Sequence, residues 1–118
     1  MSDELTLSRE DVSGLEVVRV EGEVDAANAD TLQAALEATR GPAVALDLAR
    51  VSYLESAGIR AIERGVRRIL ADARSFVIVA PDASAAHWTL VVAGFDRARV
   101  LRSVSEALSR FGPGAHGA

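Results

Sequence analysis

The chain of 118 residues contains no cysteine and no lysine. Without cysteine there is no disulfide framework, no thiolate nucleophile and no thiolate metal site. No apolar stretch approaches the roughly 18 residues that a membrane-spanning helix needs, so membrane insertion is not expected. The first ten residues, MSDELTLSRE, are acidic and lack the basic and then apolar pattern of a secretory signal. These absences are consistent with a cytoplasmic protein.

Hydrophobic residues make up 49% of the chain and charged residues 25%, which is typical of a globular protein rather than a disordered one. The length suits one domain that can bury a core without disulfides or metal. The formal net charge is −4. Because nucleic-acid-binding domains usually carry a basic surface, this charge argues against nucleic acid as a partner.

Hydrophobic periodicity predicts strands that alternate with helices. Strands are expected at 4–9, 15–21, 44–48, 76–79 and 100–101, with a loop at 22–25. Helices are expected from Asn28 to a stop at 40–42, and at 56–72, 83–93 and 103–111. The order β-β-α-β-α-β-α-β-α predicts an α/β fold with helices packed on a mixed, mostly parallel sheet.

The strand runs and the apolar side of each helix supply the expected core. Its members are Val17, Val18, Val20, Val44, Leu46, Ile59, Ile62, Val66, Ile69, Val77 and Val79, with Leu70 on the same stripe of the second helix.

Ser56 stands where a strand hands over to a helix, and three roles fit a hydroxyl there. It can cap the helix, it can be a nucleophile, or it can carry a phosphate, because helix N-termini favour anions. The hydrolase pattern G-x-S-x-G is incomplete, since residues 54–58 read LESAG. The two histidines, His87 in a predicted helix and His116 in the tail, form no catalytic order with Ser56. We therefore expect no enzyme activity.

Asp25 lies in the predicted loop after the second strand, in the sequence GEVD. Ligands of α/β sheets often bind at such positions. Glu23 and Asp25 have no histidine nearby, so no metal site is expected. The chain has no glycine-rich nucleotide loop, and we expect no cofactor.

The predicted second helix carries Arg60, Arg64, Arg67 and Arg68 away from its apolar stripe. Such a run is usually a solvated face, and the alternative is a binding surface for an acidic partner. Arg60 comes one turn after Ser56, within reach of a phosphate there.

Several stretches together resemble the STAS domain, and specifically the anti-sigma-factor antagonists. They are GEVD at 22–25, a helix that begins at Asn28, LDL at 46–48, ESAG at 55–58 and AGFDRARVLRSVSEAL at 93–108. The resemblance covers about residues 15 to 110. The chain departs from the family pattern at three positions: Glu55 replaces Asp, Ala57 replaces a second Ser, and Arg60 stands where a small or apolar residue is common.

The resemblance implies a non-catalytic switch that sequesters an anti-sigma factor with serine kinase activity. By position, Ser56 is the serine that this kinase would phosphorylate to stop binding, and a phosphoserine phosphatase would reverse it. The implied partner surface comprises Asp25, Glu55, Ser56, Ala57, Gly58 and Arg60. The domain itself would span residues 1–111, with a flexible tail at 112–118. The alternative is a constitutive STAS component of a transporter or a larger signalling assembly.

Overall fold

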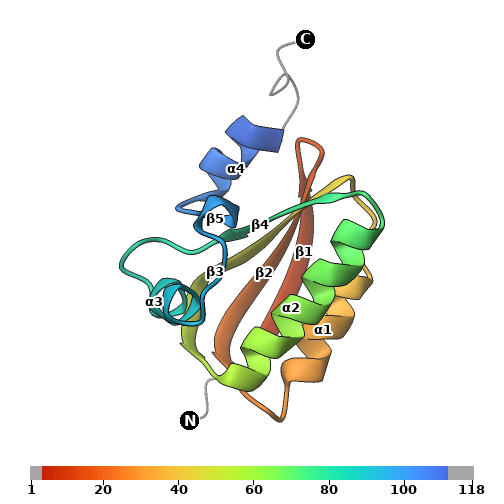
Figure 1. Cartoon of the computed structure of the whole chain (residues 1–118). Coiled ribbons are helices and arrows are strands. Elements are labelled where there is room, and N and C mark those ends of the chain that lie inside the picture. Colours follow the sequence, from red (N-terminus) through yellow and green to blue (C-terminus); the bar gives the residue numbers. More distant parts are fainter. Residues whose placement is uncertain (1–3, 112–118) are drawn as a thin grey trace.

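The computed structural model describes residues 4–111 of the chain (Figure 1). The predicted tail at 112–118 lies outside them. Strands and helices follow one another as β1 Thr6–Val12, β2 Leu15–Val24, α1 Ala29–Glu37, β3 Ala43–Leu54, α2 Ser56–Ala71, β4 Ser75–Val79, α3 Ala85–Val92, the short 3-10 helix η1 Arg97–Arg99, β5 Val100–Leu101 and α4 Val104–Phe111. The predicted order and the α/β fold class are confirmed.

The five strands form one sheet whose spatial order, β1-β2-β3-β4-β5, is also their order along the chain. β1 and β2 pair antiparallel through a tight turn at Ser13 and Gly14, both of which have positive φ. The other neighbours pair in parallel. As a result, the carboxyl ends of the parallel strands share one edge of the sheet, which we call the carboxyl edge.

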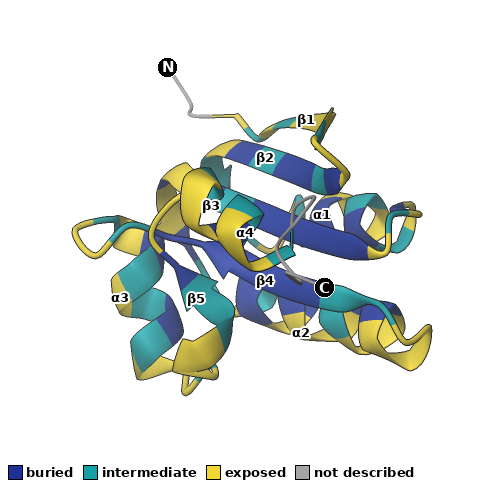
Figure 2. Ribbon diagram, turned by 90° about the horizontal axis from the view of Figure 1, so that it is seen from above, coloured by how far each residue is buried: buried dark blue, intermediate teal, exposed yellow. Residues whose placement is uncertain are grey.

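Helices cover the two faces of the sheet unequally. On one face, α1, α2 and α3 bury side chains such as Leu36, Ile62 and Leu90 in a common cluster with the sheet. On the other face, α4 packs Ala107 against Val77 and Ala45. Figure 2 shows the consequence for burial, because the central strands are buried while the edge strand β1 is largely exposed.

Three strands end later than predicted. β1 spans Thr6–Val12 rather than residues 4–9. β2 continues through Val24, so the loop expected at 22–25 is wrong for all but its last residue. The register of β2 against β3 shifts near Gly22, which has φ of +99°, and pairing resumes beyond it. β3 continues to Leu54 although its exposed residues after Leu48 break the apolar run. The carboxyl edge therefore extends further than the hydrophobic pattern indicated.

The predicted core is nearly right. All its members are buried except Val66, which is partly buried against the cluster. The predicted burial of Leu70 is wrong, because this residue of the last turn of α2 is 38% exposed. Among residues 4–111, no helix is long and apolar enough to cross a membrane.

Candidate functional site

The start of α2 and the loop between β2 and α1 meet at the carboxyl edge of the sheet. Val24 pairs with Leu54 in parallel register, so β2 and β3 end side by side. The chain leaves β2 at Asp25 and leaves β3 at Glu55, and both turns lie at the lower end of the molecule in Figure 1. Asp25 and Ser56 are 31 residues apart in the sequence, yet they belong to one surface.

Glu55 joins these two turns. Its backbone N–H donates to the carbonyl oxygen of Val24 at 2.9 Å. Its side-chain Oε2 accepts a hydrogen bond from the N–H of Ala26 at 3.1 Å. A charged acceptor makes a stronger bond than a neutral one, so the carboxylate fixes the loop of Asp25 relative to the first turn of α2. The extra methylene of Glu relative to Asp supplies part of that reach.

Ser56 is exposed and is the first residue of α2. Of the three roles considered for Ser56, the cap is excluded, because Glu55 occupies the N-cap position and no side chain caps the helix. The carbonyl oxygen of Glu55 accepts the N–H groups of Gly58 and Ile59. The N–H groups of Ser56 and Ala57 belong to the first turn, which has no preceding helical carbonyl to bond. The hydroxyl therefore faces solvent beside the positive end of the helix dipole.

Gly58 brings this turn close to the sheet. It is buried, and a Cβ added there would lie 2.6 Å from Val24 Cγ1 and 2.8 Å from Leu54 Cδ1. Any larger residue would push the first turn away from the strand ends. Gly58, which was expected at the partner surface, is thus a buried residue that determines how far Ser56 lies from the sheet.

Asp25 and Asn28 hold the neighbouring loop through mutual hydrogen bonds. Asp25 Oδ1 accepts from the N–H groups of Ala27 at 2.9 Å and Asn28 at 3.1 Å. Asn28 Oδ1 accepts from the N–H of Asp25 at 2.9 Å, and its Nδ2 donates to the carbonyl of Glu23. Asn28 does stand at the N-cap position of α1, but its side chain bonds backward to the loop and not to the helix.

The remaining predicted residues border the same surface. Ala57 is half-buried, and Arg60 is exposed one turn along α2. Sequence reasoning missed Tyr53, which is 54% exposed near the end of β3, two residues before Glu55, and pairs in register with Glu23. An aromatic residue beside the Ser56 motif was the available signal, since tyrosine is enriched at protein interfaces.

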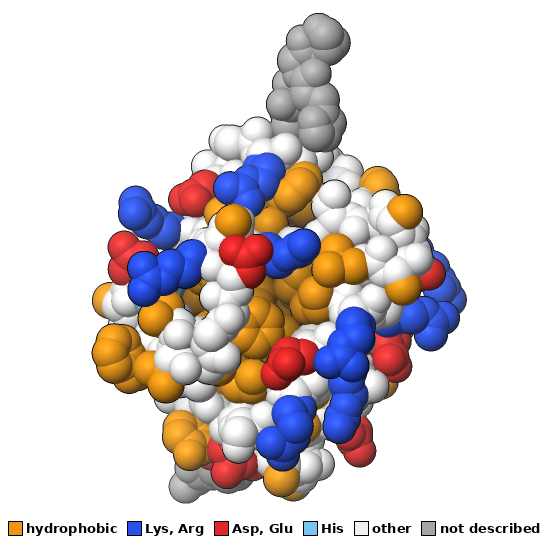
Figure 3. All heavy atoms as spheres, viewed as in Figure 1, with side chains coloured by type: hydrophobic (Ala, Val, Ile, Leu, Met, Phe, Trp, Pro, Cys, Tyr) orange, Lys and Arg blue, Asp and Glu red, His pale blue; other side chains and the backbone are white. Residues whose placement is uncertain are grey.

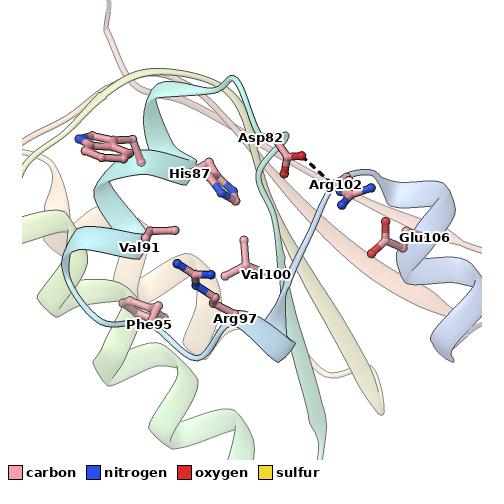
Figure 4. Close-up of a pocket in the computed structure, with 9 residues that line it drawn as sticks. Asp82, His87, Val91, Phe95, Arg97, Val100, Arg102 and Glu106 are labelled. Carbon is pink, nitrogen blue, oxygen red and sulfur yellow. Dashed lines mark ion pairs between the residues drawn. The ribbon is translucent and has the colours of Figure 1, made fainter.

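A separate cavity of about 560 Å³ lies between α3, the η1–β5 segment and α4. In Figure 4, the side chain of His87 lies above Val100, that of Arg97 lies beside Val100, and Phe95 lies below. Asp82 and Arg102 form an ion pair of 3.5 Å at its rim. His87 Nδ1 is 3.1 Å from the carbonyl oxygen of Ala80. Its lining shares no residue with the surface around Ser56.

Within residues 4–111, no group of three or more His, Asp or Glu side chains is arranged to hold a metal ion. The acidic residues at the carboxyl edge are instead engaged with backbone N–H groups, as the hydrogen bonds of Asp25 and Glu55 show.

The sequence was compared with models of known protein families. The family model described as the STAS domain matches residues 7–107. The chain belongs to the STAS domain family. The matched region contains both turns of the carboxyl edge, and the resemblance inferred from GEVD and ESAG is confirmed. A search of curated protein sequences found no match.

Solved structures similar to this STAS domain include an anti-sigma factor antagonist from Mycobacterium paratuberculosis. It is 29% identical, with a TM-score of 0.81 and coverage of 92% of this chain and 97% of that chain. Bacillus SpoIIAA, an anti-sigma factor antagonist in its unphosphorylated form, is 17% identical, with a TM-score of 0.72 and coverage of 98% of each chain.

A sulfate transporter family protein from Wolinella succinogenes is 19% identical, with a TM-score of 0.65 and coverage of 81% of this chain and 83% of that chain. At such identity, it and SpoIIAA show the shared fold alone. The structural neighbours of this STAS domain therefore include both anti-sigma factor antagonists and a protein of a transporter family.

Proposed function

We propose that this STAS domain is an anti-sigma factor antagonist whose binding is switched off by phosphorylation of Ser56. The observation that carries the proposal is the exposed Ser56 on the first turn of α2, held against the Asp25 loop by Glu55. The partner is an anti-sigma factor with serine kinase activity, and a phosphoserine phosphatase resets the switch. The similarity to the mycobacterial antagonist supports this kind of partner.

The position of Ser56 suits a phosphate that leaves the domain folded. A phosphoryl group adds about two negative charges, which the free N–H groups and dipole of a helix N-terminus accept. At a bound partner surface the same charge must lose its water next to the carboxylate of Glu55, and an unpaired buried charge is costly. Phosphate is thus compatible with folding and opposed to binding. A structure of SpoIIAA in a phosphorylated form, with the same fold, is in keeping with this distinction.

The surface around Ser56 recruits a partner rather than transforming a substrate. Asp25 and Glu55 accept backbone hydrogen bonds, and a serine nucleophile needs a base within about 3 Å that is free to take its proton. Tyr53, Ser56 and Arg60 are exposed on this surface, which provides aromatic, hydroxyl and cationic contacts to a protein. The domain accordingly acts by binding, without a cofactor.

The second candidate is a constitutive binding component of a transporter or larger assembly, favoured by the likeness to the Wolinella transporter protein. That role makes no demand on Ser56 beyond folding. The two functions therefore predict different effects of a charge at this residue.

The test compares Ser56→Asp and Ser56→Ala with wild type. Wild-type protein is used to capture its partner from the native cell, and the captured protein is then purified for calorimetric titration. Ser56→Asp should bind at least about tenfold more weakly, which is the cost of one poorly compensated interfacial charge. Ser56→Ala should bind like wild type and accept no phosphate from the partner and ATP. Its unfolding free energy should change little, because the hydroxyl makes no capping bond.

Ser105→Asp is the matched control, since Ser105 is also exposed in the first turn of a helix, on the opposite face of the sheet. It should bind like wild type. If Ser56→Asp also binds like wild type and mass spectrometry finds Ser56 unmodified after incubation with the kinase and ATP, the phosphorylation switch is wrong.

A further inference from the structure

A line of arginines runs along the outer face of α2, starting one turn after Ser56. At 3.6 residues per turn, positions 56, 60, 64 and 67 fall within about 80° of one another, and they span about 17 Å of helix. The buried residues Ile62 and Gly65 lie on the opposite side. We call Arg60, Arg64 and Arg67 the arginine stripe. Figure 3 shows basic side chains gathered over α2 in the lower right of that view.

The stripe is electrostatically unsatisfied. Each of its three arginines is exposed, and none forms an ion pair or side-chain hydrogen bond with any residue in the described part of the chain. Arginines elsewhere are commonly paired: Arg19, for example, lies 3.0 Å from Glu10 and 3.6 Å from Asp47. Outside α2, only Arg40 and Arg97 of the described arginines likewise lack an ion pair or a side-chain hydrogen bond, so three of these five arginines lie on one face of one helix.

The charge of α2 also opposes that of the whole molecule. The helix sequence contains four arginines and one glutamate, a formal net charge of +3, whereas the chain carries −4. Only Arg68 is neutralised locally, by Asp72 at 3.9 Å. Concentrated charge of one sign on a protein of the other sign steers an oppositely charged surface toward that face.

We propose that the arginine stripe docks an acidic ridge of the anti-sigma factor, alongside the contacts at Ser56. This inference rests on the proposed function and specifies the chemistry of the partner surface. Guanidinium groups suit the task because they bind carboxylates in a bidentate fashion and are weakly hydrated. The ridge must offer carboxylates over about 10 Å, the rise from Arg60 to Arg67 at about 1.5 Å per residue.

The carboxyl edge and the stripe differ in sign, which fixes the direction of docking. Asp25 and Glu55 make the start of α2 acidic, and Arg60 to Arg67 make the following turns basic. A partner with a cation facing Glu55 and carboxylates facing Arg64 fits in one orientation, because the reversed orientation opposes like charges. A phosphate on Ser56 would stand one turn from Arg60, where residues four apart on a helix interact. It therefore competes with the partner's ridge for the first guanidinium of the stripe.

The test is binding of the captured anti-sigma factor to Arg64→Glu/Arg67→Glu as a function of salt. The double variant should bind at least about tenfold more weakly than wild type at about 50 mM salt, with most of the loss in the association rate. The difference should shrink at about 500 mM salt, because the screening length falls. Arg97→Glu/Arg40→Glu is the control, since it makes the same charge change at exposed arginines outside α2 and should bind within about twofold of wild type. Circular dichroism checks that both variants fold.

Three results would overturn the inference, each in a distinct way. If wild type binds and Ser56→Asp weakens binding, but the double variant matches wild type at every salt concentration, the stripe has no role and the proposed function stands. If the control loses as much affinity as the double variant, only net charge matters. If wild type, but not the double variant, sediments with phosphatidylserine vesicles while partner binding is unchanged, the stripe serves a membrane. Failure of wild type to capture any anti-sigma factor instead rejects the proposed function, and the inference with it.

Discussion

Single residues at the carboxyl edge work by position more than by chemistry, and Gly58 is the clearest case. A side chain on Gly58 would meet Leu54 and, more closely, Val24, a stiff β-branched residue that is fully buried and has little freedom to move aside. The absence of a side chain sets how closely α2 approaches the sheet, and Ser56 and Glu55 are carried with it.

Gly58→Ala should therefore destabilise the protein, although alanine normally favours a helix by about 1 kcal/mol over glycine. Overpacking of a tight core site costs about 1–3 kcal/mol, so we expect a net loss of up to about 2 kcal/mol in the free energy of unfolding, measured by urea titration. In a Val24→Ala background the closest contact is removed and only the flexible end of Leu54 has to move, so Gly58→Ala should be clearly less destabilising than in wild type. Equal destabilisation in both backgrounds would contradict this account.

Helix α2 is the element that connects the site to the rest of the fold, and its far end stores strain. After Ala71 the chain turns through Ala73, whose φ of +59° is rare for a residue with a side chain. Arg74 N–H donates to the carbonyl of Ile69, and Ala73 N–H donates to that of Leu70. These bonds form a Schellman motif, in which the left-handed residue is usually glycine.

Ala73→Gly should raise the free energy of unfolding by about 0.5–1 kcal/mol, because glycine adopts this conformation without steric cost. Ala71→Gly, two residues earlier and also exposed, should lower it by up to about 1 kcal/mol through lost helix propensity. Thermal melts of the two variants provide the measurement. Since both lie at the end of α2 away from Ser56, affinity for the anti-sigma factor should not change.

The elements also show which features a sequence encodes locally. Apolar periodicity located α2 and its buried Ile59, Ile62 and Ile69, because a helix facing a core repeats every 3.6 residues. The ends of β2 and β3 were mispredicted because Gly22 and the exposed residues after Leu48 interrupt the pattern while cross-strand hydrogen bonds continue. A bulge is a property of the paired strands, and a single segment gives little sign of it.

The candidate site, like the fold, was predictable where it depends on local sequence and not where it depends on strand pairing. The family resemblance led to Asp25, Glu55 and Ser56, and the structure brings their two turns together. The link from Glu55 to Ala26 was not predictable, since it joins residues 29 apart whose neighbourhood depends on strand register. Asn28 and Ser56 both have side chains of types that favour the N-cap of a helix, yet neither caps one. In each case another hydrogen bond or another residue took the role.

At the scale of the whole molecule, the proposed partner surface lies at one edge of the sheet, and a stabilising arginine lies at the opposite edge. Arg74 lies between the ends of α1 and α2, just before β4 begins, and its side chain is only 13% exposed. Its Nη1 donates to Thr39 Oγ1 at 3.2 Å and to the carbonyl of Gly41 at 3.0 Å. Its Nη2 lies 3.6 Å from Asp72 Oδ2. One side chain thus ties together two connections far from Ser56.

Arg74→Met should lower the free energy of unfolding by about 2 kcal/mol, since hydrogen bonds to charged groups contribute roughly 1.5–3 kcal/mol and Met retains the apolar stem. Its affinity for the anti-sigma factor at a temperature where it is folded should equal that of wild type. Tyr53→Ala should do the reverse, with little change in stability and weaker binding, because the exposed ring belongs to the proposed partner surface. Calorimetric binding and urea unfolding on both variants separate the two edges.

The order of the strands affects how domains with this fold can acquire new binding partners. Because the sheet is wound in one direction from β1 to β5, successive crossovers place α1, α2 and α3 on the same face. Sheets whose winding reverses open a crevice at the reversal, and small ligands bind there. Continuous winding leaves at the carboxyl edge a row of helix starts and turns. Recognition then depends on exposed side chains that can be exchanged without repacking the interior, so one scaffold can acquire new specificities by surface substitution alone.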